Sequence, residues 1–359
     1  WNKWRAANTG ARRGRGRPIE TGAPARAGRA EIETAGPARA SEGEIATSEA
    51  KAIKGDEATV TDEPNWVCEV GQAQRDLKGE DCFDTRRVTL SGEDVAVIMV
   101  ADGHGGSAAS RHCRKHLLDY YIAAAGDGSA ASLLGAGATA CQQVHEEVKR
   151  ITNAGSTVTI IALNLTRGEL AVVNLGDSEA WLVPPSGSCV RLSEDHRLDT
   201  SEPERARVRG MGGHLSHARN RAGDPAGPLR LWPGGVAQAR SVGDADVGDY
   251  ILARPYVRSL CVPTGGCDVV VASDGIWDAL YSSAVASSLR SMRRQSASLA
   301  ATAIIDRAIN QRHAYDCHGY LQPRDDTTIL VMRIRRSNSA ADVAGGGASS
   351  GGGCGCVVS

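Results

Sequence analysis

The sequence predicts an α+β fold from the way apolar segments are spaced along the middle of the chain. From Trp66 onward, short apolar runs end at glycine or aspartate, as strands bounded by turns do. Helical stretches lie between these runs in pairs rather than singly. A doubly wound parallel sheet alternates single strands with single helices, so the paired helices favour α+β instead.

The expected strands are runs of β-branched and aliphatic residues flanked by turn residues. They cover residues 95–101, 158–165, 169–175, 180–183, 268–272 and 327–334. The expected helices have apolar residues three and four positions apart. They cover residues 108–125, 133–150, 203–210, 282–294 and 298–311.

Both ends of the chain differ in composition from the middle. Residues 1–65 are rich in Ala, Gly, Arg and Glu without hydrophobic periodicity, and residues 336–359 are rich in Gly and Ser. Such segments bury too little apolar surface to offset chain entropy, so we expect both to be disordered. One folded domain is expected between them, at residues 66–335. Because the chain begins with Trp1 rather than Met, we also expect that its true start is missing.

The charges almost cancel, with 41 Lys and Arg against 42 Asp and Glu, but residues 1–30 hold eight basic residues and one acid. The near-neutral total argues against nucleic acid as a partner. No run reaches the roughly 18 apolar residues of a membrane span, which excludes a transmembrane protein at this stage. The ten cysteines form no C-x-x-C pair, which favours free thiols in a reducing compartment.

Acidic residues recur where the expected strands end. Asp102, Asp177 and Asp274 each follow an apolar run, Asp325-Asp326 precede one, and Glu80-Asp81 form a further pair. A single strand-end Asp-Gly is more often a turn than a ligand. Several buried carboxylates in one domain, however, repel one another unless a cation neutralises them. With no His/Cys cluster nearby, oxygen ligation of Mg²⁺ or Mn²⁺ is the chemical match.

Six motifs occur in the order found in the protein phosphatase 2C (PPM) family of metal-dependent Ser/Thr phosphatases, which this chain resembles over about residues 66–335. They are Ala101-Asp102-Gly103-His104-Gly105-Gly106, Gly176-Asp177-Ser178, Leu192-Ser193-Glu194-Asp195-His196, Arg240-Ser241-Val242-Gly243-Asp244, Ala272-Ser273-Asp274-Gly275-Ile276-Trp277-Asp278 and Asp325-Asp326-Thr327-Thr328. Residues 194–198 and 227–235 look most like the plant and green-algal branch. The resemblance implies an antiparallel β-sandwich flanked by helices on both sides.

The resemblance also implies a centre of two Mg²⁺ or Mn²⁺ ions, whose bridging hydroxide attacks the phosphorus of phosphoserine or phosphothreonine. Asp102 would bridge the ions and the Gly103 carbonyl would ligate one of them. Asp274 and Asp325 would complete the other shell, and Glu80 and Asp81 would hold metal-bound waters. Asp177 and Asp278 match acids that recruit a third, weaker ion. His104 would protonate the departing oxygen; without the motif, a structural histidine would be the preferred interpretation.

Two departures from the family pattern leave activity open. Asp76 stands where family members commonly have a phosphate-binding Arg, with Arg75 and Lys78 as the nearest cations to replace it. Glu179 stands where Gly-Asp-Ser is usually followed by Arg. We expect an active enzyme on phosphorylated proteins. The alternatives are a catalytically impaired phosphoprotein-binding module of the same fold, and hydrolysis of small phosphate esters. The resemblance also implies a loop-rich flap at about residues 205–233 beside the active site.

The chain ends in Cys356-Val357-Val358-Ser359, a C-a-a-X pattern that predicts farnesylation of Cys356, and Cys354 is a candidate for palmitoylation. Because one lipid chain holds a protein only marginally, the second cysteine adds weight to this interpretation. The bland alternative is a tail with two free thiols. We therefore expect a monomer on the cytosolic face of a membrane, or in the cytoplasm or nucleus if the tail is unmodified.

Overall fold

Strand β3 (Glu93–Ala101) is buried along most of its length, and its side chains enter two different cores. The odd-numbered side chains from Val95 to Met99 pack against helices, whereas the even-numbered ones from Ala96 to Val100 pack against a second sheet. Successive side chains of a strand point to opposite faces, so a strand that is apolar throughout must be covered on both sides. The sheet that contains β3 therefore lies between a layer of helices and the second sheet.

The computed structural model describes residues 66–311 and 325–337. The chain divides between Val60 and Thr61, and all the described residues belong to the second unit. They form two five-stranded sheets in which every strand pairing is antiparallel. One sheet has the order β13 (Tyr256–Cys261), β7 (Glu169–Leu175), β6 (Val158–Asn164), β3 and β2 (Cys82–Leu90). The other has the order β1 (Trp66–Arg75), β15 (Thr327–Arg336), β14 (Cys267–Ala272), β8 (Glu179–Val183) and β9 (Val190–Arg191).

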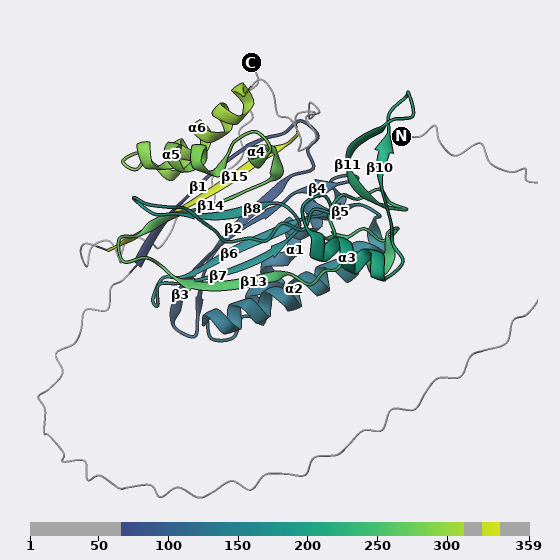
Figure 1. Ribbon diagram of the computed structural model, residues 1–359. Coiled ribbons are helices and arrows are strands. Elements are labelled where there is room, and N and C mark those ends of the chain that lie inside the picture. Colours follow the sequence, from purple (N-terminus) through teal and green to yellow (C-terminus); the bar gives the residue numbers. More distant parts are fainter. Residues whose placement is uncertain (1–65, 312–324, 338–359) are drawn as a thin grey trace, which may run out of the picture. The chain divides into compact units, whose positions relative to one another are not determined.

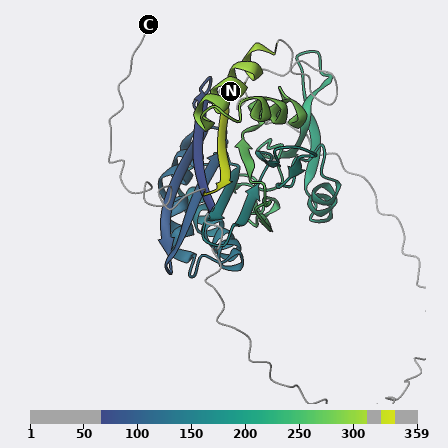
Figure 2. The ribbon, with the colours of Figure 1, turned by 90° about the vertical axis from the view of Figure 1, so that its left-hand side faces the viewer.

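Helices cover both outer faces of the two sheets. Helices α1 (Ala108–Ala124) and α2 (Ala130–Ile151) pack on the sheet that contains β3, while α4 (Asp274–Trp277), α5 (Ser282–Ser291) and α6 (Ala297–Asn310) pack on the sheet that contains β15. Figure 1 shows these two groups on opposite sides of the strands, and Figure 2 shows β15 beside β1 in the turned view. The predicted α+β sandwich with helices on both sides is therefore confirmed.

A separate small layer extends from one end of the sandwich. It contains the three-stranded sheet β12 (Val242–Gly243), β5 (Gly155–Ser156) and β4 (Gly103–His104), and the hairpin β10 (His214–Arg219) and β11 (Pro225–Trp232). Helix α3 (Glu202–Gly210) and a short 3₁₀ turn, Gly248–Tyr250, complete it. Its own apolar core is formed by Leu198, Val208, Leu231, Val236, Ala239, Val247 and Ile251. The region expected to be a loop-rich flap is thus a packed helix and hairpin.

All six predicted strands and all five predicted helices are present, and two helix ends differ from the prediction by three residues. Helix α2 begins at Ala130 rather than at residue 133. Helix α5 ends at Ser291 instead of continuing to residue 294. Beyond Ser291 the N–H of Arg293 bonds to the Arg290 carbonyl and that of Gln295 to the Met292 carbonyl, each three residues back, so the chain turns more tightly than an α-helix. The Arg333 guanidinium, which is buried and paired with Asp268 at 3.0 Å, donates hydrogen bonds to the carbonyl oxygens of Met292 and Gln295 in this turn.

Strands β1, β2, β10, β11 and β13 were not among the predicted elements. They carry many polar side chains, so their alternation is weak in the sequence. No helix among residues 66–311 and 325–337 has the length and hydropathy needed to cross a membrane.

Candidate active site

The acidic residues predicted from strand ends lie at one end of the sandwich because the strand register places them there. Asp102 follows β3, whose last residue Ala101 is opposite Cys82, and Asp81 immediately precedes Cys82. In the other sheet, Arg75 is opposite Thr327, and Ala272 is opposite both Ile329 and Glu179. The ends that carry Glu80, Asp81, Asp102, Asp177, Asp274 and Asp325 therefore meet.

Close backbone packing fixes the Asp274 turn against the strand of the second acidic pair. A Cβ atom on Gly275 would lie 2.0 Å from the Asp326 carbonyl oxygen, so only glycine fits there. The N–H of Ser273 donates to Thr328, and the N–H of Thr328 donates to the Ser273 hydroxyl. These contacts hold the two segments in one arrangement.

The two adjacent aspartates 325 and 326 have different environments. Asp326 is buried and accepts hydrogen bonds from the backbone N–H groups of Leu77, Lys78, Glu80 and Asp81. Burial opposes its ionisation, but these donors outweigh burial and hold the pKa of Asp326 below its usual value. Asp326 is thus a structural carboxylate that shapes the turn after β1. Asp325 instead extends outward to Lys78 Nζ at 2.5 Å, and its role as a metal ligand stays a prediction.

The acids at this end of the sheets raise one another's pKa values. Burial raises the pKa of Asp102 well above its usual value, and the charges of Asp274 and Asp81 add to the effect. Burial likewise raises the pKa of Asp274, with Asp177 the nearest contributing charge. Burial raises the pKa of Asp81 to about 6, and its Oδ2 atom is buried without a hydrogen-bond partner among the described residues. Groups of this kind are stabilised by a cation.

The donor set implied by the resemblance, carboxylate oxygens and the carbonyl of Gly103, would suit Mg²⁺ or Mn²⁺ rather than a softer metal. Glu80 lies over the same turn, since its Oε1 accepts a hydrogen bond from the N–H of Gly106 at 2.7 Å. Within the described part of the chain, no three Asp, Glu, His or Cys side chains already converge on one point. Asp325 and Asp274 are instead held by the cationic side chains of Lys78 and Arg197. The residues fit such ions by charge, burial and chemistry.

Arg197 occupies the place that the sequence assigned to acids for a third metal ion. Its Nε atom lies 2.7 Å from Asp177, Nη1 lies 3.0 Å from Asp278, and Nη2 lies 3.3 Å from Asp274. Burial alone would raise the pKa of Asp177, but the charge of Arg197 outweighs it and lowers that pKa. The sequence did not identify Arg197 as a site residue, because the residues that it contacts lie 20 to 81 positions away.

His104 is bonded to a residue whose role the sequence also left unassigned. Its Nε2 atom lies 2.8 Å and 2.9 Å from the two carboxylate oxygens of Asp244, which is buried. Strands β12, β5 and β4 bring these residues together across 140 positions. Burial would lower the pKa of His104, but the charge and hydrogen bond of Asp244 raise it. Asp244 therefore favours the protonated form of His104.

The two candidate phosphate-binding cations lie on different faces of the β1 end. Arg75 continues the alternation of Gly71 and Ala73, which face helix α6 and its core. Lys78 follows in the turn and reaches Asp325. Its pKa is raised because the carboxylates of Asp325, Glu80 and Asp274 outweigh the opposing effect of burial. Of the two, Lys78 lies among the acidic side chains.

Glu179, the second departure from the family pattern, is paired away from the acidic cluster. Its carboxylate accepts hydrogen bonds from Arg191 at 2.8 Å and from the Trp181 indole at 2.7 Å. Asp76 is similarly engaged by the amide of Gln74 at 2.7 Å. The charge of Glu179 is therefore neutralised by Arg191, and Asp76 is hydrogen-bonded by a neutral amide at an exposed position.

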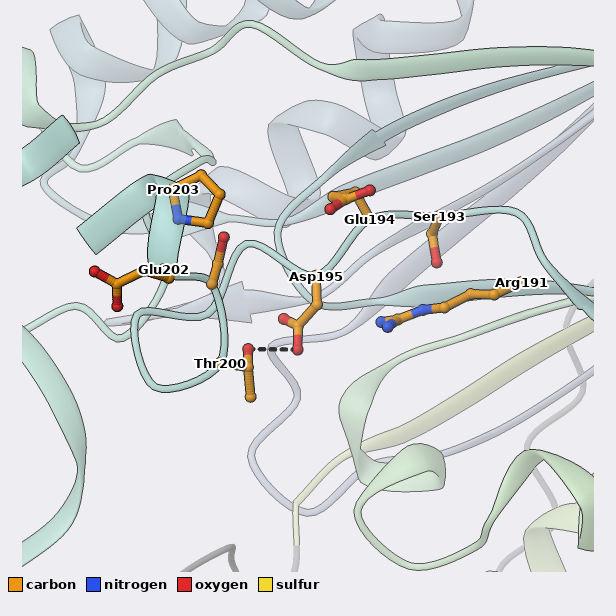
Figure 3. A pocket seen from close by; sticks show the side chains of 8 residues that line it. Arg191, Ser193, Glu194, Asp195, Thr200, Glu202 and Pro203 are labelled. Atoms are coloured by element: carbon orange, nitrogen blue, oxygen red, sulfur yellow. Dashed lines mark hydrogen bonds between the residues drawn. The ribbon is translucent and has the colours of Figure 1, made fainter. Parts of the chain in front are cut away.

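An open hollow of about 420 Å³ lies beside the loop that carries Arg197 (Figure 3). Figure 3 shows its lining: Arg191, Ser193, Glu194, Asp195, Thr200, Ser201, Glu202 and Pro203. The hydroxyl of Thr200 donates to Asp195 at 2.7 Å, and Arg191 is engaged by Glu179. Three carboxylates line this hollow, and its one arginine is already paired with Glu179. The hollow therefore repels phosphate and is distinct from the acidic cluster.

His196 holds the turn that presents Asp177. It is buried, and its Nδ1 atom lies 2.9 Å from the Gly176 carbonyl oxygen. Burial lowers the pKa of His196 to about 4. Because the folded pKa is below the unfolded value, this residue favours folding above about pH 6.5 and loses that effect as pH falls toward 4.

We expect the free energy of unfolding to fall between pH 7 and pH 5 by about 2 kcal/mol more in wild type than in His196→Gln. Urea denaturation in the presence of a chelator measures both proteins at both pH values. The subtraction removes the carboxylates, which titrate alike in the two proteins. Equal pH dependence in wild type and variant would contradict the assignment.

Cys354 and Cys356 lie outside the described residues, as do residues 1–65, so the lipid anchor, the disordered ends and the location in the cell stay predictions. The same holds for the monomeric state and for the absence of a nucleic-acid partner. The 66–335 domain boundary also stays a prediction; among the described residues β1 begins at Trp66, β15 ends at Arg336, and the two strands pair with each other.

Comparison with known proteins supports the relationship. "Probable protein phosphatase 2C 12" of Arabidopsis thaliana is 34% identical over 277 residues, covering 74% of this chain and 61% of that protein. "Probable protein phosphatase 2C 69" of Oryza sativa subsp. japonica is 33% identical over 285 residues, covering 76% and 63%. The chain thus spans about three fifths of the length of these curated relatives.

Solved structures share the fold. A C. elegans sex determining protein aligns with a TM-score of 0.60 at 21% identity, covering 74% of this chain and 64% of that one. Serine-threonine phosphatase 2C from Toxoplasma gondii aligns with a TM-score of 0.56 at 17% identity, covering 76% and 100%. Residues 76–316 match the sequence model of the family described as "Protein phosphatase 2C". The chain belongs to the protein phosphatase 2C family, and its relatives are of the plant type.

Proposed function

We propose that this protein is a protein serine/threonine phosphatase that uses two Mg²⁺ or Mn²⁺ ions. Metal dependence is general in the family to which the chain belongs. The observation that carries the proposal is the gathering of buried, mutually repelling carboxylates beside Lys78 and the His104–Asp244 pair. The ions would be held by Asp102, the Gly103 carbonyl, Asp274 and Asp325, with Glu80 and Asp81 around them.

When bound, such ions activate water at neutral pH and neutralise charge on the phosphoryl oxygens. The chain itself supplies three further functions. Asp102 lies at the centre of the cluster, between the acidic residues that come from the two sheets. His104, fixed by Asp244, donates a proton to the departing serine or threonine oxygen. Asp326 and the N–H groups it accepts from hold the turn that carries Lys78.

Lys78 is proposed to bind the substrate phosphate. Its side chain is 46% exposed while its ammonium group lies against Asp325, so it can reach both the solvent and the acidic cluster. Lysine binds phosphate as a point charge without a fixed geometry. Arg75 has the better fork for phosphate, but it leaves β1 on the face toward α6.

We expect Lys78→Ala to lower kcat/KM for a phosphothreonine peptide about tenfold, mainly through KM, because one charged hydrogen bond to phosphate is lost. Arg75→Ala is the matched control, with an expected change of less than about twofold. Initial rates over a range of peptide concentrations measure both. The reverse order of effects would assign the phosphate to Arg75.

The direct test of the function is release of phosphate from phosphothreonine peptides by the full chain with Mn²⁺, with Mg²⁺ and with chelator. Phosphate release that requires both the metal and Asp102 supports the proposal of an active enzyme. If the folded, metal-loaded protein releases no phosphate, the alternative of a phosphoprotein-binding module is favoured instead. The pairing of Glu179 with Arg191 removes one reason for expecting impairment. A higher kcat/KM for nucleotides or small esters than for phosphopeptides would favour a different substrate class.

A further inference from the structure

The Arg197 guanidinium contacts three carboxylates from two separate segments. Asp177 follows β7, whereas Asp274 begins α4 and Asp278 directly follows its last residue, and each carboxylate contacts a different nitrogen of the guanidinium. The Arg197 side chain is 28% exposed and that of Asp177 is 4% exposed. An arginine on the surface rarely gains much from an ion pair, but one that is largely buried with three acids is firmly placed.

The backbone around Arg197 holds the side chain in this position. Its N–H donates to the Asp195 carboxylate at 3.0 Å, and the residue forms a β-bridge with Gln238. The amide of Gln238 lies 3.4 Å from both carboxylate oxygens of Asp177, so it supports the same acid. The next residue, Leu198, is fully buried in the core of the small layer. Movement of the Arg197 backbone would therefore disturb this core.

The planar guanidinium already supplies the positive charge that the outer acids require. Its nitrogens lie within hydrogen-bonding distance of one oxygen of each carboxylate, at 2.7 to 3.3 Å. A divalent ion at Asp177 and Asp278 would need the same oxygens and would face the charge of Arg197 at short range. Only the Oδ2 atom of Asp274 contacts Arg197, so its Oδ1 atom would be available to the two ions of the proposed centre.

We propose that Arg197 takes the place of a third metal ion, so that the protein binds two divalent ions and uses a fixed guanidinium at Asp177 and Asp278. The inference rests on the proposed function only for the presence of the two-ion centre. It replaces the expectation that Asp177 and Asp278 recruit a third ion. The charge at this position is then independent of the free metal concentration.

The test counts bound Mn²⁺ on the full chain by equilibrium dialysis and elemental analysis at millimolar Mn²⁺. We expect two ions in wild type and three in Arg197→Gln, because glutamine removes the charge and frees the acids. Arg167→Gln is the matched control, since Arg167 pairs with Glu93 in the turn at the other end of β6 and β7. It should bind two ions. The double variant Arg197→Gln, Asp278→Asn should return to two.

Two results would overturn the inference: three ions in wild type, or two ions in folded Arg197→Gln. Since that variant leaves three acids without their arginine, folding is checked by circular dichroism with Mn²⁺ present. Anomalous scattering from wild-type crystals in Mn²⁺ supplies a test that needs no variant. Two peaks with Arg197 between Asp177 and Asp278 support the inference, and a third peak there overturns it. Because ions are counted without turnover, an inactive protein that binds two ions would defeat only the proposed function.

Discussion

Asp102→Asn is expected to lower kcat for a phosphothreonine peptide at least about 10³-fold, which corresponds to about 4 kcal/mol of transition-state stabilisation. Asp102 lies where both sheets bring their acids together, and the charges of Asp274 and Asp81 act on it directly. Asparagine keeps the size of the side chain but removes the charge that would hold the cations. No other residue of the cluster can take over this central position.

The same substitution should leave the metal-free protein as stable as wild type, or more so. Asp102 has a raised pKa because it is buried among other carboxylates, so its negative charge opposes folding when no cation is bound. The melting temperature with chelator tests this sign. A variant that is stable and inactive excludes unfolding as the cause of the lost activity.

Asp119→Asn is the control, because Asp119 is 64% exposed on α1 and its nearest ion-pair partner, Arg86, lies 3.9 Å away. It should keep full activity and the same requirement for Mn²⁺. If Asp102→Asn retained more than about a tenth of wild-type activity, the acidic cluster would not be the catalytic centre.

The acidic cluster could be predicted from the sequence because its residues are tied to local signals. Asp102 and Asp274 each follow a buried strand and precede a glycine, and antiparallel pairing then brings strand ends together. The six strands with continuous apolar runs were predictable for the same reason. In these segments, local pattern and tertiary packing favour the same structure.

The partners of these residues could not be predicted, because they depend on contacts between distant segments. In the sequence, Arg197 has no feature that distinguishes it from other polar loop residues. Only the packing of the small layer places it against Asp278. The hydrogen bonds of Asp326 are equally absent from local pattern, because the N–H groups of Lys78 and Glu80, which donate two of them from the turn after β1, lie 248 and 246 positions away in the sequence.

Asp244 shows most clearly what tertiary structure adds to the site. A Cβ atom on Gly155 would lie 2.2 Å from Asp244 Oδ2 and 2.3 Å from His104 Nε2. The middle strand of the small sheet must therefore be glycine at this point, so that the imidazole and the carboxylate can meet across it. Ser241 donates a further hydrogen bond to Asp244. Close packing against Gly155 and the hydrogen bond from Ser241 thus hold His104 and Asp244 together before any substrate binds.

This arrangement predicts that His104→Gln will affect substrates according to their leaving group. A serine or threonine alkoxide needs a proton to depart, whereas p-nitrophenolate departs readily without one. We expect kcat for a phosphothreonine peptide to fall about 10²-fold or more, and kcat for p-nitrophenyl phosphate to change less than about fivefold. Asp244→Asn should lower kcat for the phosphothreonine peptide by only about tenfold and again affect p-nitrophenyl phosphate less, because asparagine can still orient the ring but carries no charge.

The matched control is His112→Gln on the outer helices, where His112 Nε2 lies 2.8 Å from Glu147 in a comparable histidine–carboxylate pair. It should change neither rate. Equal losses on both substrates in His104→Gln would mean that the histidine only shapes the metal centre, as a structural histidine would. A loss confined to the phosphothreonine peptide requires proton donation, since the two substrates meet the same metal centre and differ chiefly in the oxygen that leaves.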